Sequence, residues 1–218
     1  MRIWRLSSEL PHSCARLLRR GTWIKPPEVT GTCEECTRSF EVRVSPLLVE
    51  WDPESGGSLA DVTDAAFASD FVLSANAVSV LEEFCCWHAG PVEVVNPSPR
   101  LSLGALSDLL ADLTVSADLD VSSIEVERRC GTCGTVYWRL RGASAAAWKS
   151  SETGRPIRGQ VARSDVGIVV RRHAVGTAEI FKVEQFPAWT LVSDTVRNAM
   201  TETGLTGVRF FEVGSLID

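Results

Sequence analysis

The chain has 218 residues and a formal net charge of −6, with 44% hydrophobic and 23% charged residues. These values exclude a disordered or low-complexity chain and are sufficient for one large domain or two small ones with a buried core. The N-terminal segment lacks the apolar core of a signal peptide and no stretch reaches the length of a membrane span, so we expect a soluble, cytoplasmic protein.

The negative charge is concentrated in the middle of the chain. Between Val44 and Glu127 there are fifteen Asp and Glu residues and a single basic residue, Arg100. Such a region disfavours phosphate backbones and favours basic proteins, although charged segments often serve only solubility. The candidate partner-binding residues are Asp61, Asp64, Asp70, Asp108, Asp112, Asp118 and Asp120.

The first motif lies in VTGTCEECTRSFEVRV, residues 29 to 44. Apolar residues at 40, 42 and 44 alternate with charged residues at 41 and 43, which is typical of a half-buried strand. The pattern predicts that Cys33 and Cys36 lie at the tip of a β-hairpin.

The segment DFVLSANAVSVLEEFCCWHAGPVEVV, residues 70 to 95, predicts a strand, a helix and a second strand. Its first apolar run ends at Ser74, which is suited to cap a helix of about ten residues. We expect that helix to stop near Gly90 and a β-rich run to follow. The segment LGALSDLLADL, residues 103 to 113, predicts a further helix.

Cys85, Cys86 and His88 in FCCWHAG form a weaker cluster. Adjacent cysteines at the end of a helix are expected to point in different directions, so they do not easily bind one ion. Because free cysteine is commonly buried, we interpret these two as core residues.

The second motif lies in VERRCGTCGTVYWRL, residues 126 to 140, and matches the first motif without gaps. Glu28 and Glu125 each lie five residues before the first cysteine of their motif, and Phe40 and Tyr137 each follow it by seven. We interpret the two segments as two copies of one small β unit with a cysteine pair at each tip.

The segment AWTLVSDTVRNAMTETGLTGVRFFEV, residues 188 to 213, repeats the strand-helix-strand pattern of residues 70 to 95. Ser193 is placed as the helix N-cap, and Gly204 and Gly207 follow the helix. Because neither copy can bury its apolar face alone, we expect each to pack against sheet elsewhere in the protein.

Together the two cysteine pairs predict a structural zinc site formed by Cys33, Cys36, Cys130 and Cys133. Closing the loop of 97 residues between the pairs costs about 5 kcal/mol, whereas structural zinc binding by short peptides releases roughly 10 to 16 kcal/mol. Four thiolates leave no open position for a substrate, so we expect a structural ion rather than a catalytic one.

Disulfides and unliganded core thiols are alternatives for these cysteines. A redox enzyme would place its reactive thiol at a helix N-terminus, whereas both pairs precede strands. A zinc-ribbon nucleic-acid binder or regulatory protein would use the same cysteines; the basic residues near the second pair are Arg128, Arg129, Arg139 and Arg141. The net negative charge argues against that alternative.

We therefore expect an α+β fold with mixed or antiparallel sheets, two zinc-knuckle hairpins and strand-helix-strand units. Residues 1–141 are expected to hold both hairpins with an inserted α/β unit. Residues 142–218 are expected to form the C-terminal strand-helix-strand unit, packed with the rest as one compact domain.

The motifs CEECT at 33 to 37 and CGTCG at 130 to 134, with the terminal LVSDTVRNAMTETGLTGVRFFEV, resemble the double-CXXCG-motif family of myxobacterial proteins. That family is associated with immunity to swarming-inhibition toxins. The first motif ends in Thr37 where the family usually has glycine.

The resemblance implies that Cys33, Cys36, Cys130 and Cys133 carry the family's motif. It also implies a cytoplasmic antitoxin that binds and neutralises a cognate protein toxin and is not an enzyme. The acidic residues between 44 and 127 are then candidates for contact with a basic toxin.

Overall fold

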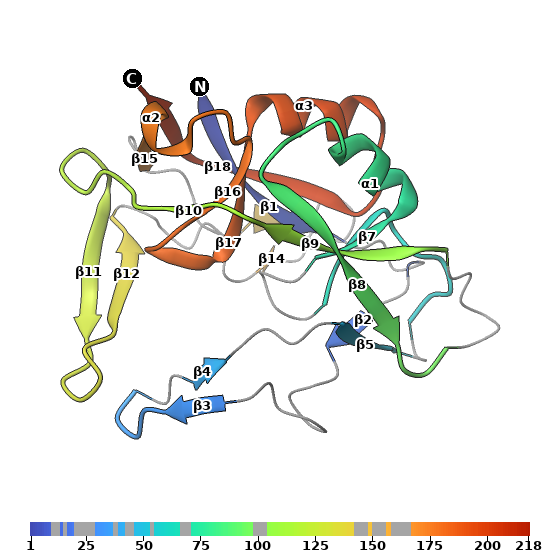
Figure 1. The fold of residues 1–218 in the computed structure, drawn as a ribbon, viewed down its shortest axis with the longest axis horizontal. Coiled ribbons are helices and arrows are strands. Elements are labelled where there is room, and N and C mark those ends of the chain that lie inside the picture. The colour runs from blue at the N-terminus through green and yellow to red at the C-terminus, as the bar shows by residue number, and fades with distance from the viewer. Residues whose placement is uncertain are drawn as a thin grey trace.

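The computed structural model describes residues 1–9, 14, 17–19, 29–36, 39–41, 46–52, 55–65, 71–97, 104–141, 148–149, 156–157 and 167–218. Over these residues the fold is dominated by sheet, with a few short helices (Figure 1). This is consistent with the expected α+β fold with mixed or antiparallel sheets. The helices are α1 (Ala75–Leu81), α2 (Arg172–Val175) and α3 (Asp194–Glu202).

Within the described residues, two six-stranded sheets form the body of the fold. The first has the order β10-β16-β17-β1-β18-β15 and the second the order β2-β5-β8-β9-β7-β6. The strands of the first sheet are β1 (Arg2–Ser8), β10 (Thr114–Val115), β15 (Ile168–Arg171), β16 (Ile180–Val183), β17 (Phe186–Ser193) and β18 (Val208–Ile217). Those of the second are β2 (Leu17–Arg19), β5 (Leu47–Trp51), β6 (Val62–Asp64), β7 (Phe71–Ser74), β8 (Trp87–Val94) and β9 (Leu106–Ala111).

Three further strand pairs lie outside these sheets in the described part of the chain. They are β3 (Val29–Thr32) with β4 (Ser39–Glu41), β11 (Ile124–Arg129) with β12 (Val136–Leu140), and β13 (Trp148–Lys149) with β14 (Pro156–Ile157). The first two pairs are the antiparallel hairpins expected to carry the cysteines. Val42 and Val44, expected to extend the first hairpin, lie outside the described residues.

The two sheets are built on the same plan. In one, β1 lies between β17 and β18 and is antiparallel to both; in the other, β9 lies between β7 and β8 and is antiparallel to both. The outer neighbours correspond as well, because β16 and β6 add antiparallel strands while β15 and β5 add parallel ones. The internal repeat expected from the sequence is therefore present in the pairing of the strands.

Divided before β9, the described elements form two halves that share one order: an initial strand, a cysteine hairpin, three strands, a helix and a final strand. The strands β2 and β10, the β13–β14 pair and the short helix α2 are additional to this shared order. The initial strand of each half lies in the sheet of the other, since β1 joins β17 and β18, and β9 joins β7 and β8. Neither sheet is complete without the other half, so the repeats are joined in the body of the fold as well as at the cysteines.

The predicted caps are confirmed at both main helices. The Ser74 hydroxyl accepts a hydrogen bond from the backbone N–H of Ala77, and the Ser193 hydroxyl accepts one from Val196. Gly204 follows α3 with a φ of 69°, a left-handed conformation that glycine adopts at low cost. The expectation that Gly90 stops the first helix is wrong, because α1 ends at Leu81 and Gly90 lies inside β8.

The helix expected over residues 103 to 113 is also wrong. Residues Leu106–Ala111 form β9, which is hydrogen-bonded to a strand on each side. A strand at the centre of a sheet can carry apolar residues on both faces, and its sequence then lacks the simple alternation that identifies a half-buried strand.

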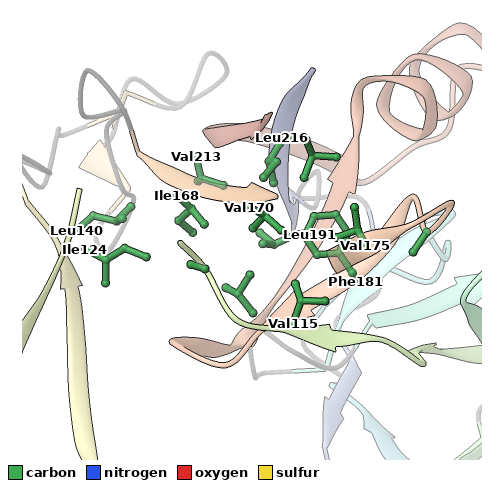
Figure 2. Packing of buried hydrophobic residues seen from close by; sticks show 14 of the residues in the cluster. Val115, Ile124, Leu140, Ile168, Val170, Val175, Phe181, Leu191, Val213 and Leu216 are labelled. Atoms are coloured by element: carbon green, nitrogen blue, oxygen red, sulfur yellow. The ribbon is translucent and has the colours of Figure 1, made fainter. Parts of the chain in front are cut away.

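Among the described residues, three hydrophobic clusters besides that of the cysteines hold the sheets and helices together. The largest lies against the first sheet and includes Phe181, Leu191 and Val213 (Figure 2). A second lies between the halves, where α1 and α3 pack against each other and Met200 and Leu81 are almost completely buried. The third covers the second sheet around β5.

The parallel pair β15 and β18 depends on two glycines. Gly214 faces Ile168, and a Cβ at Gly214 would lie 1.8 Å from the Ile168 carbonyl oxygen. Gly167 has a φ of 70°, and a Cβ there would lie 2.2 Å from the Val213 carbonyl oxygen. The close approach of these backbones therefore requires glycine at both positions.

Candidate metal centre

The turns of the two hairpins meet at one edge of the molecule, away from α1 and α3 (Figure 1). Cys33 and Cys36 flank the turn after β3, and Cys130 and Cys133 flank the turn after β11. In the second turn the backbone N–H of Gly134 donates to the Cys130 carbonyl at 3.0 Å, and that of Cys130 donates to Thr135 at 2.9 Å. These bonds fold the chain tightly, so that both sulfur atoms of the pair project to one side.

Gly134 has a φ of 72°, in the left-handed region that other residues avoid. This explains the glycine after the second cysteine of the motif. Thr37, which takes the same place in the first motif, lies outside the described residues.

The four sulfur atoms form a compact cluster. All lie within 4.8 Å of one another, with Cys33 to Cys130 at 3.6 Å and Cys36 to Cys133 at 3.7 Å. A tetrahedral zinc ion with Zn–S bonds of about 2.3 Å requires sulfur separations of about 3.8 Å. A disulfide requires about 2.05 Å. The spacing therefore fits four ligands of one ion, and all four cysteines are free thiols.

The cluster is largely shielded from solvent. Cys33, Cys36 and Cys130 are 7%, 9% and 4% exposed, and Tyr137 packs against them. Cys133 is the most accessible of the four. An ion bound here would have all four tetrahedral positions filled by sulfur, which is the arrangement of structural zinc sites.

Glu35 joins the two turns directly. Its carboxylate accepts hydrogen bonds from the backbone N–H groups of Gly131 at 3.3 Å and Thr132 at 2.9 Å, and from the Thr132 hydroxyl at 2.6 Å. The bond from the Thr132 hydroxyl is the largest cause that lowers the pKa of Glu35, to about 2. Sequence reasoning missed this residue, because only the meeting of the hairpins shows which partner Glu35 has.

The thiols differ in how readily they lose their protons. Contact with the Thr135 hydroxyl, at 3.1 Å, is the largest cause lowering the pKa of Cys133 to about 6. The backbone N–H of Cys133 favours the Cys130 thiolate. Burial and hydrogen bonds with neighbouring sulfur atoms outweigh it and raise the pKa of Cys130 to about 12. A bound cation would therefore have to displace the proton of Cys130.

The base of the second hairpin is anchored in the largest hydrophobic cluster. Ile124 begins β11 and Leu140 ends β12, and both are buried beside Ile168 (Figure 2). The cysteine turn is thus positioned by an apolar core at the other end of its own hairpin.

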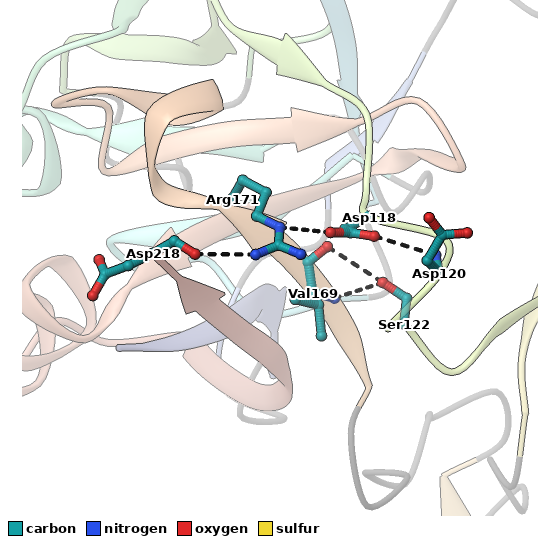
Figure 3. Close-up of polar contacts among 6 residues, drawn as sticks. All are labelled: Asp118, Asp120, Ser122, Val169, Arg171 and Asp218. Atoms are coloured by element: carbon teal, nitrogen blue, oxygen red, sulfur yellow. Dashed lines mark hydrogen bonds and ion pairs between the residues drawn. The ribbon is translucent and has the colours of Figure 1, made fainter.

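Polar contacts fix the loop that enters this hairpin. Ser122 Oγ accepts from the backbone N–H of Val169 at 2.9 Å and donates to its carbonyl at 3.3 Å. Arg171 Nε lies 2.6 Å from Asp118 Oδ2, and its Nη1 donates to the Asp218 carbonyl at 3.1 Å (Figure 3). The C-terminal end of the chain therefore helps to hold the approach to the second hairpin.

Two of the aspartates expected to face a partner are instead engaged within the protein or buried in it. Asp61 accepts hydrogen bonds from Ser74 and Asn76 in its own half, and from Thr206 in the other half. Burial alone would raise the pKa of Asp61, but these bonds outweigh it and lower that pKa. Asp108 is only 3% exposed, so it is not available at the surface.

The remaining aspartates differ in accessibility. Asp118 is paired with Arg171, and Asp112 contacts His88. Asp64 is half-buried, and burial raises its pKa. Asp120 is exposed. Asp70 lies outside the described residues.

The contact of Asp61 with Ser74 has a counterpart in the second half. Ser193 Oγ donates to Glu179 Oε1 at 3.3 Å, and its backbone N–H donates to the Glu179 carbonyl at 3.0 Å. The Ser74 backbone likewise donates to the Asp61 carbonyl at 2.9 Å. Each cap serine is thus held by an acidic residue one position before β6 or β16. This repeated contact was not evident from the internal match of residues 70 to 95 with residues 188 to 213.

Basic residues near the second cysteine pair are largely engaged within the protein. Arg139 and Arg141 both contact the Glu125 carboxylate, at 2.6 and 3.3 Å. The Arg128 guanidinium lies 4.1 Å from the centre of the Tyr137 ring. These contacts leave few of the cations expected for phosphate binding free to act.

The interpretation of Cys85 and Cys86 as core residues is wrong for Cys85, which is exposed, while Cys86 is half-buried. The expectation that they point in different directions is also wrong, because their sulfur atoms lie 3.8 Å apart. Cys86 has a φ of 68°, in the left-handed region that residues other than glycine rarely adopt.

No family model matches the chain, and no curated protein matches it. Within the described residues, no helix combines the length and apolar character that crossing a membrane requires. The site itself defines the class of centre: four cysteines from two hairpins, positioned to hold a metal ion.

Proposed function

We propose that the chain is an immunity protein that binds and neutralises a cognate protein toxin, on a scaffold held by a structural zinc ion. The ion is bound by Cys33, Cys36, Cys130 and Cys133. The observation that carries the zinc proposal is the close grouping, within 4.8 Å, of four sulfur atoms from segments 97 residues apart, with two separations near the roughly 3.8 Å of a tetrahedral zinc site.

The form of the cluster supports a structural role for the metal. Its four thiolates would fill the tetrahedral shell, and Glu35 adds a contact between the turns that does not involve the ion. An immunity protein requires a stable scaffold and a complementary surface, and such a clamp serves the first of these requirements.

For the toxin-binding surface we propose the loop before β11, centred on Asp120. Leu119 and Val121 on either side are 43% and 42% exposed, and Val126 on β11 is 49% exposed. Large apolar side chains in solvent beside a carboxylate are suited to a protein partner with an apolar and basic surface. The ion pair of Asp118 with Arg171 keeps this loop in place (Figure 3).

The alternative of a zinc-ribbon nucleic-acid-binding or regulatory protein is less well supported. It would use the arginines beside the second cysteine pair, but Arg139 and Arg141 are paired with Glu125 and Arg128 lies on Tyr137. A net charge of −6 also opposes binding to phosphates.

Co-expression with the product of the adjacent gene in a sensitive host tests the immunity proposal. We expect the wild-type chain to restore growth and to co-purify with that product. The Asp120→Lys variant, with its zinc content unchanged, is expected to protect less well. Unchanged killing with full expression of the chain would contradict immunity to that product.

A further inference from the structure

A second pair of thiols, Cys85 and Cys86, lies outside the four-cysteine cluster. Their sulfur atoms are 3.8 Å apart. This is nearly the separation of Cys36 and Cys133, at 3.7 Å. Cys85 is exposed and Cys86 is half-buried, whereas in the other pair Cys133 is exposed and Cys36 is buried.

The backbone holds both sulfur atoms on the same side. Within the described part of the chain, Cys86 is the one residue other than glycine with a positive φ, at 68°. A side chain in this region is under steric strain, so surrounding contacts must maintain the conformation. The backbone N–H of Asp112 donates to the Cys86 carbonyl at 2.9 Å and provides one such contact.

The surroundings also fix the first thiol. Cys85 Sγ donates to the Thr177 carbonyl at 3.1 Å and lies 3.7 Å from the Thr177 hydroxyl. The nearby His88 imidazole is occupied by Asp112. Within the described residues, the one group of three or more cysteine, histidine or acidic side chains close enough to share an ion is the four-cysteine cluster. Among the described residues, the exposed pair therefore offers two sulfur ligands and no third cysteine, histidine or carboxylate ligand.

We propose that Cys85 and Cys86 form a dithiol site that binds a soft, thiol-seeking centre through both sulfur atoms, of which trivalent arsenic is the simplest. Soft ligands such as thiolates select soft centres, and two sulfur atoms held together suit a centre of low coordination number. Zinc in a tetrahedral site would need two further ligands, so the pair and the four-cysteine cluster are expected to take different ligands.

Phenylarsine oxide is the probe that tests this geometry. Its arsenic–oxygen bond is replaced by two arsenic–sulfur bonds, and the two thiol protons leave with the oxygen as one molecule of water. No electrons are transferred, so no oxidant or reductant is required. Binding would replace the contact of Cys85 with Thr177.

The experiment adds one equivalent of phenylarsine oxide to the zinc-loaded full chain and measures the intact mass and the zinc content by native mass spectrometry. We expect one adduct per chain with zinc retained. Cys85→Ser and Cys86→Ser should each abolish the adduct, whereas Cys14→Ser, which removes a thiol outside both clusters, should not change it.

Two controls separate loss of the site from loss of the fold. Near-ultraviolet circular dichroism and zinc content should match the wild type in each variant. Iodoacetamide should still label Cys85 in Cys86→Ser, which would show that one accessible thiol is insufficient for the arsenical. Absence of an adduct on the wild type, its persistence in Cys85→Ser, or its formation with release of zinc would overturn the proposal.

Discussion

Cys33 and Cys130 are 97 residues apart in the chain, and their sulfur atoms lie 3.6 Å apart in the fold. Each belongs to a separate hairpin, and each hairpin occupies the same place in one of two similar halves. The four-cysteine cluster therefore joins equivalent elements of an internal repeat.

Removal of one cysteine ligand should destabilise the whole chain. We expect Cys33→Ser to lose zinc and to lower the free energy of unfolding by more than about 4 kcal/mol, because a structural metal contributes directly to folding. Chemical denaturation and zinc analysis measure the two effects. Cys14→Ser is the matched control, and an equal loss of stability in both variants would contradict a role specific to the cluster.

Glu35 should strengthen the junction without being a ligand. Glu35→Gln weakens the acceptor of the Gly131 and Thr132 hydrogen bonds. We expect zinc affinity to fall roughly 10-fold, as is typical when a contact outside the ligand set is lost, with one ion still bound. Competition with a chromophoric chelator measures the affinity. Glu34→Gln makes the same charge change on the adjacent residue and should have little effect.

The pair of Asp118 and Arg171 should contribute to stability in a defined pH range. The hydrogen bond from Arg171 lowers the pKa of Asp118 below its ordinary value of 3.8. A carboxyl group whose pKa is lower in the folded state than in the unfolded state stabilises the fold when the pH is above the unfolded-state pKa. This contribution is lost as the pH falls through the folded-state pKa. Asp118→Asn should therefore have a lower free energy of unfolding than the wild type at pH 5. The difference between the two proteins should become smaller in stronger acid.

Urea denaturation at a series of pH values, with equal zinc loading, measures this difference. Asp120→Asn is the control, because Asp120 is exposed on the same loop. If the difference between Asp118→Asn and the wild type were the same at every pH, the pair would not contribute as proposed.

The cap serines should contribute similarly in the two halves. Ser74→Ala and Ser193→Ala each remove the acceptor for a helix N–H, and we expect each to cost about 1 to 2 kcal/mol of stability. Ser193 is fully buried, so its loss should be the larger. Thermal denaturation provides the measurement. Thr195 is exposed on α3, so Thr195→Ala is the control. A loss of stability in Thr195→Ala as large as that in Ser193→Ala would argue against capping.

The loop around Asp120 should determine affinity for the toxin. Asp120→Lys reverses a charge at the proposed surface, and we expect slower association and a weaker dependence of affinity on salt. Surface plasmon resonance with the purified product of the adjacent gene measures both. Asp52 is an acidic residue elsewhere in the same charged region, and Asp52→Lys is the control variant. Equal effects of the two variants would favour general charge over a defined surface.

Local patterns predicted the features that depend on neighbouring residues. The hairpins β3–β4 and β11–β12 follow from alternating residues and a tight cysteine turn, and the caps Ser74 and Ser193 follow from an apolar run that ends at a hydroxyl. The meeting of the four cysteines was also predicted, because the strength of zinc binding by thiolates exceeds the cost of closing the loop between them.

Features that depend on the placement of β1 and β9 in the sheet of the other half were not predicted. The segment Leu106–Ala111 has the composition of a buried helix, and only its place between β7 and β8 explains why it is a strand. The contacts of Glu35 with Thr132 and of Asp61 with Thr206 cross between the halves. No local pattern specifies such partners, since they are set by how the two halves pack.

X-ray absorption spectroscopy at the zinc edge of the purified chain tests the central claim most directly. We predict one zinc ion per chain with four sulfur neighbours at about 2.3 Å. A first shell with nitrogen or oxygen atoms, fewer than four sulfur atoms, or no bound metal in a correctly folded chain would contradict the proposed site.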